Sequence, residues 1–152
     1  MNPSDSDWRI RRHIYEALAA SGRAPDAREI AQRFAISRPE ARQALRRLHE
    51  AHALVLQPGG EAVLMAHPFS AVATDYRVLV DGVALYANCA WDSLGIPAML
   101  ARDAAIAARH PLTGDIMRYA VESGRLRSES DRDLLVHFAH PFRQWYDDIV
   151  ET

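Results

Sequence analysis

The sequence contains only one cysteine, Cys89, among 152 residues. A single thiol excludes an internal disulfide, a four-cysteine zinc site and a Cys-x-x-Cys redox pair. Chemistry at Cys89 therefore requires partners other than cysteine, a bound small thiol, or a second copy of the chain. One unpaired cysteine is typical of a reducing compartment, and the polar, acidic residues 1–7 are unlike a secretory signal. We therefore expect a cytoplasmic protein.

Several common functional patterns are also missing. The chain has no Walker loop, no Gly-x-Ser-x-Gly elbow and no dinucleotide-binding fingerprint. No apolar run approaches the length of about 20 residues that spans a bilayer, so we expect no membrane partner. The seven histidines show no paired metal spacing, and we interpret them as structural or surface residues. They are His13, His49, His52, His67, His110, His137 and His140.

Lysine is absent, so all 18 basic residues are arginine. Residues 1–50 hold ten Arg against seven acidic residues, a net charge of about +3. Residues 51–152 hold eight Arg against thirteen acidic residues, a net charge of about −5. A charge of about +3 is small for a DNA-binding domain, so we do not expect DNA as a partner.

Residues 1–70 have the pattern of a winged helix-turn-helix domain. Apolar residues at helical spacing predict helices over 7–21, 27–34 and 37–48. Asp26 and Ser37 begin the second and third of these with capping boxes. Two β-prone segments, 53–56 and 62–65, flank Pro-Gly-Gly and predict a hairpin wing. In a DNA-binding version, the third helix would present Arg38, Arg42 and Arg46 to the major groove. The alternative is that these arginines form an ordinary solvated helix face.

Residues 71–152 predict a small β-rich domain with short helices, so the fold class is α+β, with the N-terminal lobe packed directly on it. Strands are expected over 76–80 and 83–86, joined by a tight Asp-Gly turn. A helix over 90–101 should be bent or broken by Gly95 and Pro97. Further strands are expected over 104–109, 116–121 and 133–138, with a polar loop over 122–131 and a terminal helix over 141–150.

Cys89 follows a predicted strand and precedes a predicted helix. If Asn88 caps that helix, Cys89 is its first residue, and the helix N-terminus should lower the thiol pKa below its usual value of about 8.5. Asp92 then lies one turn further along, on the same face. Sulfur is a soft ligand, so this pair suits a soft, polarisable metal. The alternative is that Cys89 is only a small buried hydrophobe.

The segment Asn-Cys-Ala-Trp-Asp-Ser-Leu-Gly-Ile-Pro-Ala at 88–98 resembles the alkylmercury lyase (organomercurial lyase, MerB) family, as do 136–138 and 145–149. The resemblance implies that Cys89 takes the mercury of an organomercurial and that Asp92 helps to deliver a proton to the departing carbon. Both residues would then contact the metal, and Hg(II) would stay on the protein. No added cofactor is implied, because mercury belongs to the substrate. The N-terminal lobe would be a packing module.

This sequence departs from the family pattern at one important position. The family's second cysteine precedes the Val-His-Phe segment, where this chain has no thiol. Asp133 is the best match to that position, and the resemblance makes it a third catalytic candidate, which could donate a proton if burial raised its pKa. The chain is also shorter than typical members, which indicates a shortened or divergent homologue. Three hypotheses follow: a lyase-like enzyme assisted by a small cellular thiol, a protein that binds Hg(II) or another thiophilic ligand without cleavage, and a winged-helix transcriptional regulator.

Overall fold

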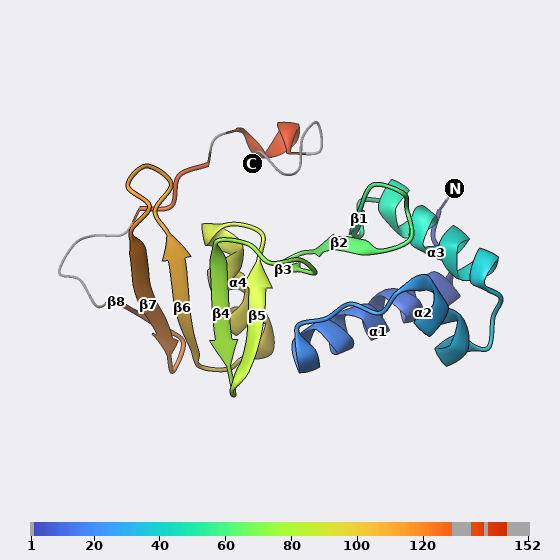
Figure 1. Ribbon diagram of the computed structural model, residues 1–152, viewed down its shortest axis with the longest axis horizontal. Helices are drawn as coiled ribbons and strands as arrows, with labels where there is room; N and C mark the ends of the chain where they lie inside the picture. Colours follow the sequence, from blue (N-terminus) through green and yellow to red (C-terminus); the bar gives the residue numbers. More distant parts are fainter. Residues whose placement is uncertain (1, 129–134, 139, 146–152) are drawn as a thin grey trace.

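Three helices form the N-terminal part of the computed structural model, which describes residues 2–128, 135–138 and 140–145. They are α1 (Asp5–Ser21), α2 (Ala27–Phe34) and α3 (Arg38–Glu50), and they pack together at one end of the molecule (Figure 1). Each begins with a capping box, in which the cap residue and the third helical residue bind each other's backbone amides. The predicted boxes at Asp26 and Ser37 are confirmed, and a third is present at Ser4.

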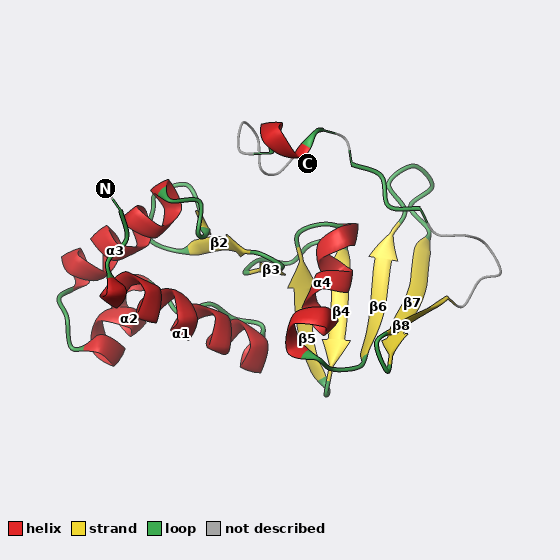
Figure 2. Cartoon of the chain, turned by 180° about the vertical axis from the view of Figure 1, so that it is seen from behind, coloured by secondary structure: helices red, strands yellow, loops and turns green. Residues whose placement is uncertain are grey.

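The described strands form a single antiparallel sheet in the order β1-β2-β3-β5-β4-β6-β7-β8. Helix α4 (Ala90–Leu100) covers one face of its centre (Figure 2). This combination of helices and antiparallel sheet confirms the α+β class, while the winged-helix interpretation and the division at residue 70 stay predictions. The strands are β1 (Val55–Leu56), β2 (Val63–Ala66), β3 (Phe69–Ser70), β4 (Tyr76–Val80), β5 (Val83–Ala87), β6 (Ala104–Arg109), β7 (Ile116–Glu122) and β8 (Arg125–Ser128).

One hydrophobic core joins the helices to the sheet. Ile14 and Leu18 of α1 belong to the same buried cluster as Leu85 of β5 and Ile96 of α4. Gly22 ends α1 in a left-handed conformation, and a Cβ at this position would lie 2.5 Å from the backbone oxygen of Ala84. The absence of a side chain therefore allows α1 to approach β5 closely.

The C-terminal part differs from the sequence-based expectation in three ways. The polar segment 122–131 was expected to be a loop, but β7 continues to Glu122, and β8 pairs with it from Arg125. All four residues of β8 are exposed, so the strand has no apolar alternation to reveal it. The strand expected over 133–138 is absent from the described residues 135–138, and residues 133–134 lie outside the described part. Of the terminal helix, the structure describes a short 3₁₀ turn, η1 (Phe142–Gln144).

Helix α4 is not broken at its centre. It runs without interruption from Ala90 to Leu100 and contains Pro97. A proline lacks one amide donor, so the helix loses a single backbone hydrogen bond there. Gly95 packs tightly, since a Cβ would lie 3.1 Å from Pro68. Asp92 therefore lies in an unbroken helix that begins directly after Cys89.

Candidate active site around Cys89

Cys89 lies where β5 has ended and α4 begins. It is the N-cap residue of α4, in an extended backbone conformation, and its carbonyl accepts a hydrogen bond of 3.0 Å from the Ser93 amide. The prediction that Asn88 caps the helix is therefore wrong by one residue, because the chain leaves the extended conformation only after Cys89. Asp92 lies in the first turn of the helix, as expected.

The pKa of the Cys89 thiol is raised, whereas the sequence predicted that it would be lowered. Burial of the sulfur has the largest effect. The backbone amides of Asp92 and Trp91 lower the pKa, as expected at a helix N-terminus, but the Asp92 carboxylate raises it further. Burial therefore outweighs the helix terminus, and the side chain is a protonated thiol at neutral pH. A soft metal that binds this sulfur must displace the proton.

Two side chains hold the Asp92 carboxylate by its Oδ2 atom. The Asn88 amide Nδ2 donates to it at 2.8 Å, and His67 Nδ1 lies 3.2 Å away. The side chain of Asp92 is only 14% exposed and that of His67 is 37% exposed. His67 lies in the turn between β2 and β3, 25 positions before Asp92. Sequence analysis missed this contact because no local pattern links two residues so far apart.

Two tyrosines interact electrostatically with the thiol. Burial raises the pKa of Tyr76 and of Tyr119, and the charge of a Cys89 thiolate raises both further. The Tyr119 hydroxyl is 2.7 Å from Ser93 Oγ. On the outer side, the Trp91 ring is 56% exposed and contacts Phe138 edge to face, with 6.2 Å between ring centroids. This exposed aromatic pair, one ring of which follows Cys89 by two positions, can pack against an apolar organic group.

The sequence profile of the alkylmercury lyase (MerB) family matches residues 69–152, which is more than half of the chain and includes Cys89 and Asp92. The chain belongs to this family. A crystal structure of the mercury-bound form of MerB2 has a similar fold, with a TM-score of 0.68 and 21% sequence identity over 85% of this chain. The matched part is 62% of the MerB2 chain, so this protein spans less than two thirds of that length. No curated protein matches this sequence.

Asp133, which was matched to the second cysteine of the alkylmercury lyase family, lies outside the described residues. Its proposed place near Cys89 therefore stays a prediction. Among the described residues, no group of three His, Cys, Asp or Glu side chains could hold a metal ion. The same part of the chain contains no helix that is long and apolar enough to cross a membrane.

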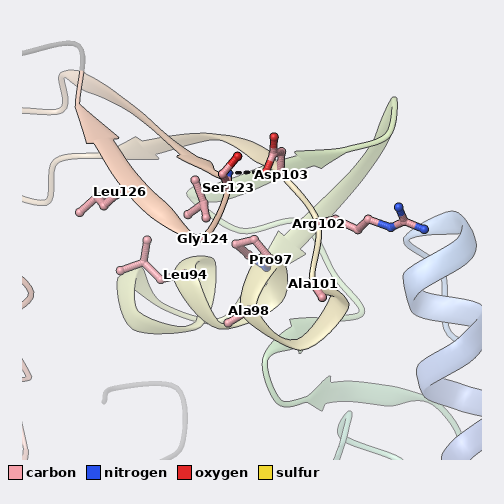
Figure 3. A pocket seen from close by; sticks show the side chains of 10 residues that line it. Leu94, Pro97, Ala98, Ala101, Arg102, Asp103, Ser123, Gly124 and Leu126 are labelled. Atoms are coloured by element: carbon pink, nitrogen blue, oxygen red, sulfur yellow. Dashed lines mark hydrogen bonds between the residues drawn. The ribbon is translucent and has the colours of Figure 1, made fainter.

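A cavity of about 490 Å³ lies beside α4 (Figure 3). Leu94, Pro97 and Ala98 of α4 line one side, and Leu126 of β8 lies opposite. Two polar residues that line the cavity are hydrogen-bonded, since the Ser123 backbone amide donates to Asp103 Oδ1 at 2.7 Å. Neither Cys89 nor Asp92 lines this cavity, so we do not assign the lyase chemistry to it.

The arginines that could have contacted DNA are largely engaged within the protein. Arg38 and Arg42 of α3 both form ion pairs with Glu61, at 2.8 and 2.6 Å. Glu61 lies in the connection between β1 and β2, where the sequence predicted the hairpin wing. Its charge offsets part of the positive charge that would attract phosphates. Whether this helix binds DNA stays a prediction.

Proposed function

We propose that this member of the alkylmercury lyase family breaks carbon–mercury bonds by protonolysis. The observation that carries the proposal is the neighbourhood of one half-buried thiol and one oriented carboxylate at the start of α4. Cys89 supplies the soft ligand that mercury prefers. Asp92, in the first turn of the helix, supplies an oxygen that can carry a proton to carbon.

The reaction can be written with all protons accounted for. The organomercurial cation R–Hg⁺ binds the Cys89 sulfur, and the displaced thiol proton passes to the Asp92 carboxylate. The protonated Asp92 then gives this proton to the carbon bound to mercury. The electron pair of the C–Hg bond forms the new C–H bond, and the hydrocarbon R–H leaves. Hg(II) remains bound to the Cys89 sulfur with the Asp92 carboxylate beside it. The raised thiol pKa supports this scheme, because the thiol brings the proton that the reaction consumes.

Mercury must leave before a second turnover can begin. The chain has no second cysteine to take up Hg(II), and a carboxylate such as Asp133 is a hard and therefore poor ligand for it. We propose that small cellular thiols remove the product, which suits a cytoplasmic location. No resident cofactor enters the scheme.

The single cysteine also favours a second candidate function, capture of an organomercurial or Hg(II) without cleavage. This alternative requires only the Cys89 thiol and predicts a stable adduct that keeps its organic group. It differs from the first proposal in one property, the fate of the carbon–mercury bond. The winged-helix regulator is the least supported alternative, because Arg38 and Arg42 are already paired with Glu61.

The test measures the hydrocarbon released from phenylmercury in the presence of excess small thiol. We expect benzene above the level of a thiol-only control, and none above it from Cys89→Ser. The control variant Glu16→Gln changes an exposed residue of α1, outside the proposed site, and should release benzene at the wild-type rate. Wild-type release no greater than the thiol-only control would refute the lyase proposal.

A further inference from the structure

Resting on the proposed function, we propose that His67 and Asn88 are positioning residues that fix the Asp92 carboxylate for proton transfer. The family match begins at residue 69, so His67 lies outside it. The proposal follows from the hydrogen bonds around Asp92 Oδ2 and from the chain of contacts that holds His67 in place.

The donors around Asp92 form one consistent arrangement. His67 Nδ1 lies 3.2 Å from both Asp92 Oδ2 and Asn88 Nδ2, so it either donates to the carboxylate or accepts from the amide, depending on the tautomer. We assign the hydrogen to Nδ1, because the Asn88 amide has two other acceptors. Asn88 Nδ2 has two hydrogens, and acceptors lie near it at Asp92 Oδ2, 2.8 Å away, and at the Pro68 carbonyl, 3.3 Å away. Both donors therefore end on the same carboxylate oxygen.

The other oxygen of the carboxylate is left for the reaction. Within the described part of the chain, no hydrogen bond reaches Asp92 Oδ1. Two donors on Oδ2 prevent rotation of the carboxylate and keep Oδ1 in one orientation. The Asn88 Oδ1 atom is buried, and no partner for it is found among the described residues. A buried acceptor without a partner costs stability, which fits an amide held in place for Asp92 and not for folding.

The N-terminal lobe holds His67 in place from the other side. The Tyr15 hydroxyl of α1 donates to the His67 carbonyl at 3.0 Å. Arg11 donates to the Tyr15 hydroxyl at 2.8 Å and lies over its ring, with 4.3 Å from the guanidinium carbon to the ring centroid. The chain Arg11–Tyr15–His67–Asp92 thus connects the helical lobe to the proposed proton donor.

Two variants of His67 test whether the ring acts by donating a hydrogen bond from Nδ1. In His67→Asn, the amide nitrogen can occupy the place of Nδ1, whereas in His67→Gln it reaches the place of Nε2. Asn88→Leu removes the second donor at similar size. We would load each protein with one equivalent of phenylmercury, and measure loss of the free thiol for capture and benzene for cleavage.

We expect His67→Gln and Asn88→Leu to cleave about 10- to 100-fold more slowly, because a charge-assisted hydrogen bond is lost. Their capture rates should stay within about twofold of wild type, since Cys89 is unchanged. His67→Asn should recover most of the cleavage rate. Wild-type cleavage by His67→Gln, or equal losses in His67→Asn and His67→Gln, would overturn the proposal.

A second readout applies if the wild-type protein captures mercury without releasing benzene, a result that would refute the lyase function alone. Nitrogen-15 NMR of the His67 ring reports which nitrogen carries the hydrogen. We expect the Nδ1–H tautomer in the wild type and its loss in Asp92→Ala. An Nε2–H tautomer in the wild type would overturn the positioning role independently of activity.

Discussion

The sulfur of Cys89 is subject to two opposing influences. The amides at the start of α4 lower the thiol pKa, while burial and the Asp92 carboxylate raise it, and burial has the largest effect. A free cysteine at a helix terminus would be a reactive thiolate, but here the proton is retained until a ligand displaces it. This makes Cys89 selective for partners that bind sulfur strongly.

Alkylation by iodoacetamide measures this pKa directly. The thiolate is the reactive form, so the rate should rise with pH through a midpoint above that of a denatured control. Asp92→Asn removes a nearby negative charge and should move the midpoint to lower pH. A wild-type midpoint below that of the denatured protein would show that the helix terminus, and not burial, dominates.

Among the secondary-structure elements, α1 and α3 are joined by a partly buried ion pair. Asp7 is 1% exposed, and its carboxylate binds Arg47 at 2.8 and 2.9 Å while also serving the Ser4 capping box. The Arg47 hydrogen bonds are the main cause of the lowered pKa of Asp7. The Asp7 side chain therefore both stabilises the start of α1 and binds α1 to α3.

Asp7→Asn should lower the free energy of unfolding by roughly 2–4 kcal/mol, because it leaves Arg47 without its charge partner and weakens the cap. In the wild type, the contribution is present above the unfolded-state pKa of Asp7. It should be lost as pH falls through the lower folded-state pKa. Urea unfolding at neutral and acidic pH tests both statements. The control is Glu16→Gln, which removes the exposed ion pair between Arg12 and Glu16 and should change stability little. Equal losses of stability in both variants would contradict this account.

The elements that could be predicted are those with a local signal. The capping boxes at Asp26 and Ser37 and the turn at Asp81-Gly82 are read from adjacent residues, and the structure places helices and a hairpin there. Strand β8 has four exposed residues and no apolar alternation, so only its pairing with β7 defines it. The His67–Asp92 contact and the burial of Cys89 depend on tertiary packing, which explains why the first was missed and the thiol pKa was predicted in the wrong direction.

At the scale of the whole molecule, the helical lobe is attached to the sheet at two places that bear on the site. Tyr15 holds the His67 carbonyl, and Gly22 lets the end of α1 approach the Ala84 carbonyl of β5. Figure 1 shows one end of α1 next to β5, with β2 and β3 linking the two parts of the chain. The helical lobe thus acts in this account as a support for the site.

Gly22→Ala tests this attachment. Gly22 has φ +70, so alanine there is strained, and its Cβ would meet the Ala84 oxygen. Gly124 has φ +74, and a Cβ added there would have no atom within 4 Å, so Gly124→Ala shares the backbone strain without the clash. The strain costs about 1 kcal/mol in each variant, and the clash should make the Gly22→Ala loss about two- to threefold larger. Equal losses in thermal unfolding would show that the close approach does not matter for stability.

The most direct test of the central claim is intact-protein mass spectrometry after incubation with one equivalent of phenylmercury. This account predicts that the wild type first gains the mass of mercury with its phenyl group and then retains mercury alone. Cys89→Ser should remain unmodified, and Asp92→Ala should keep the phenyl group. A wild-type adduct that keeps its phenyl group indefinitely, or mercury bound equally well by Cys89→Ser, would contradict the proposal that Cys89 and Asp92 together break the carbon–mercury bond.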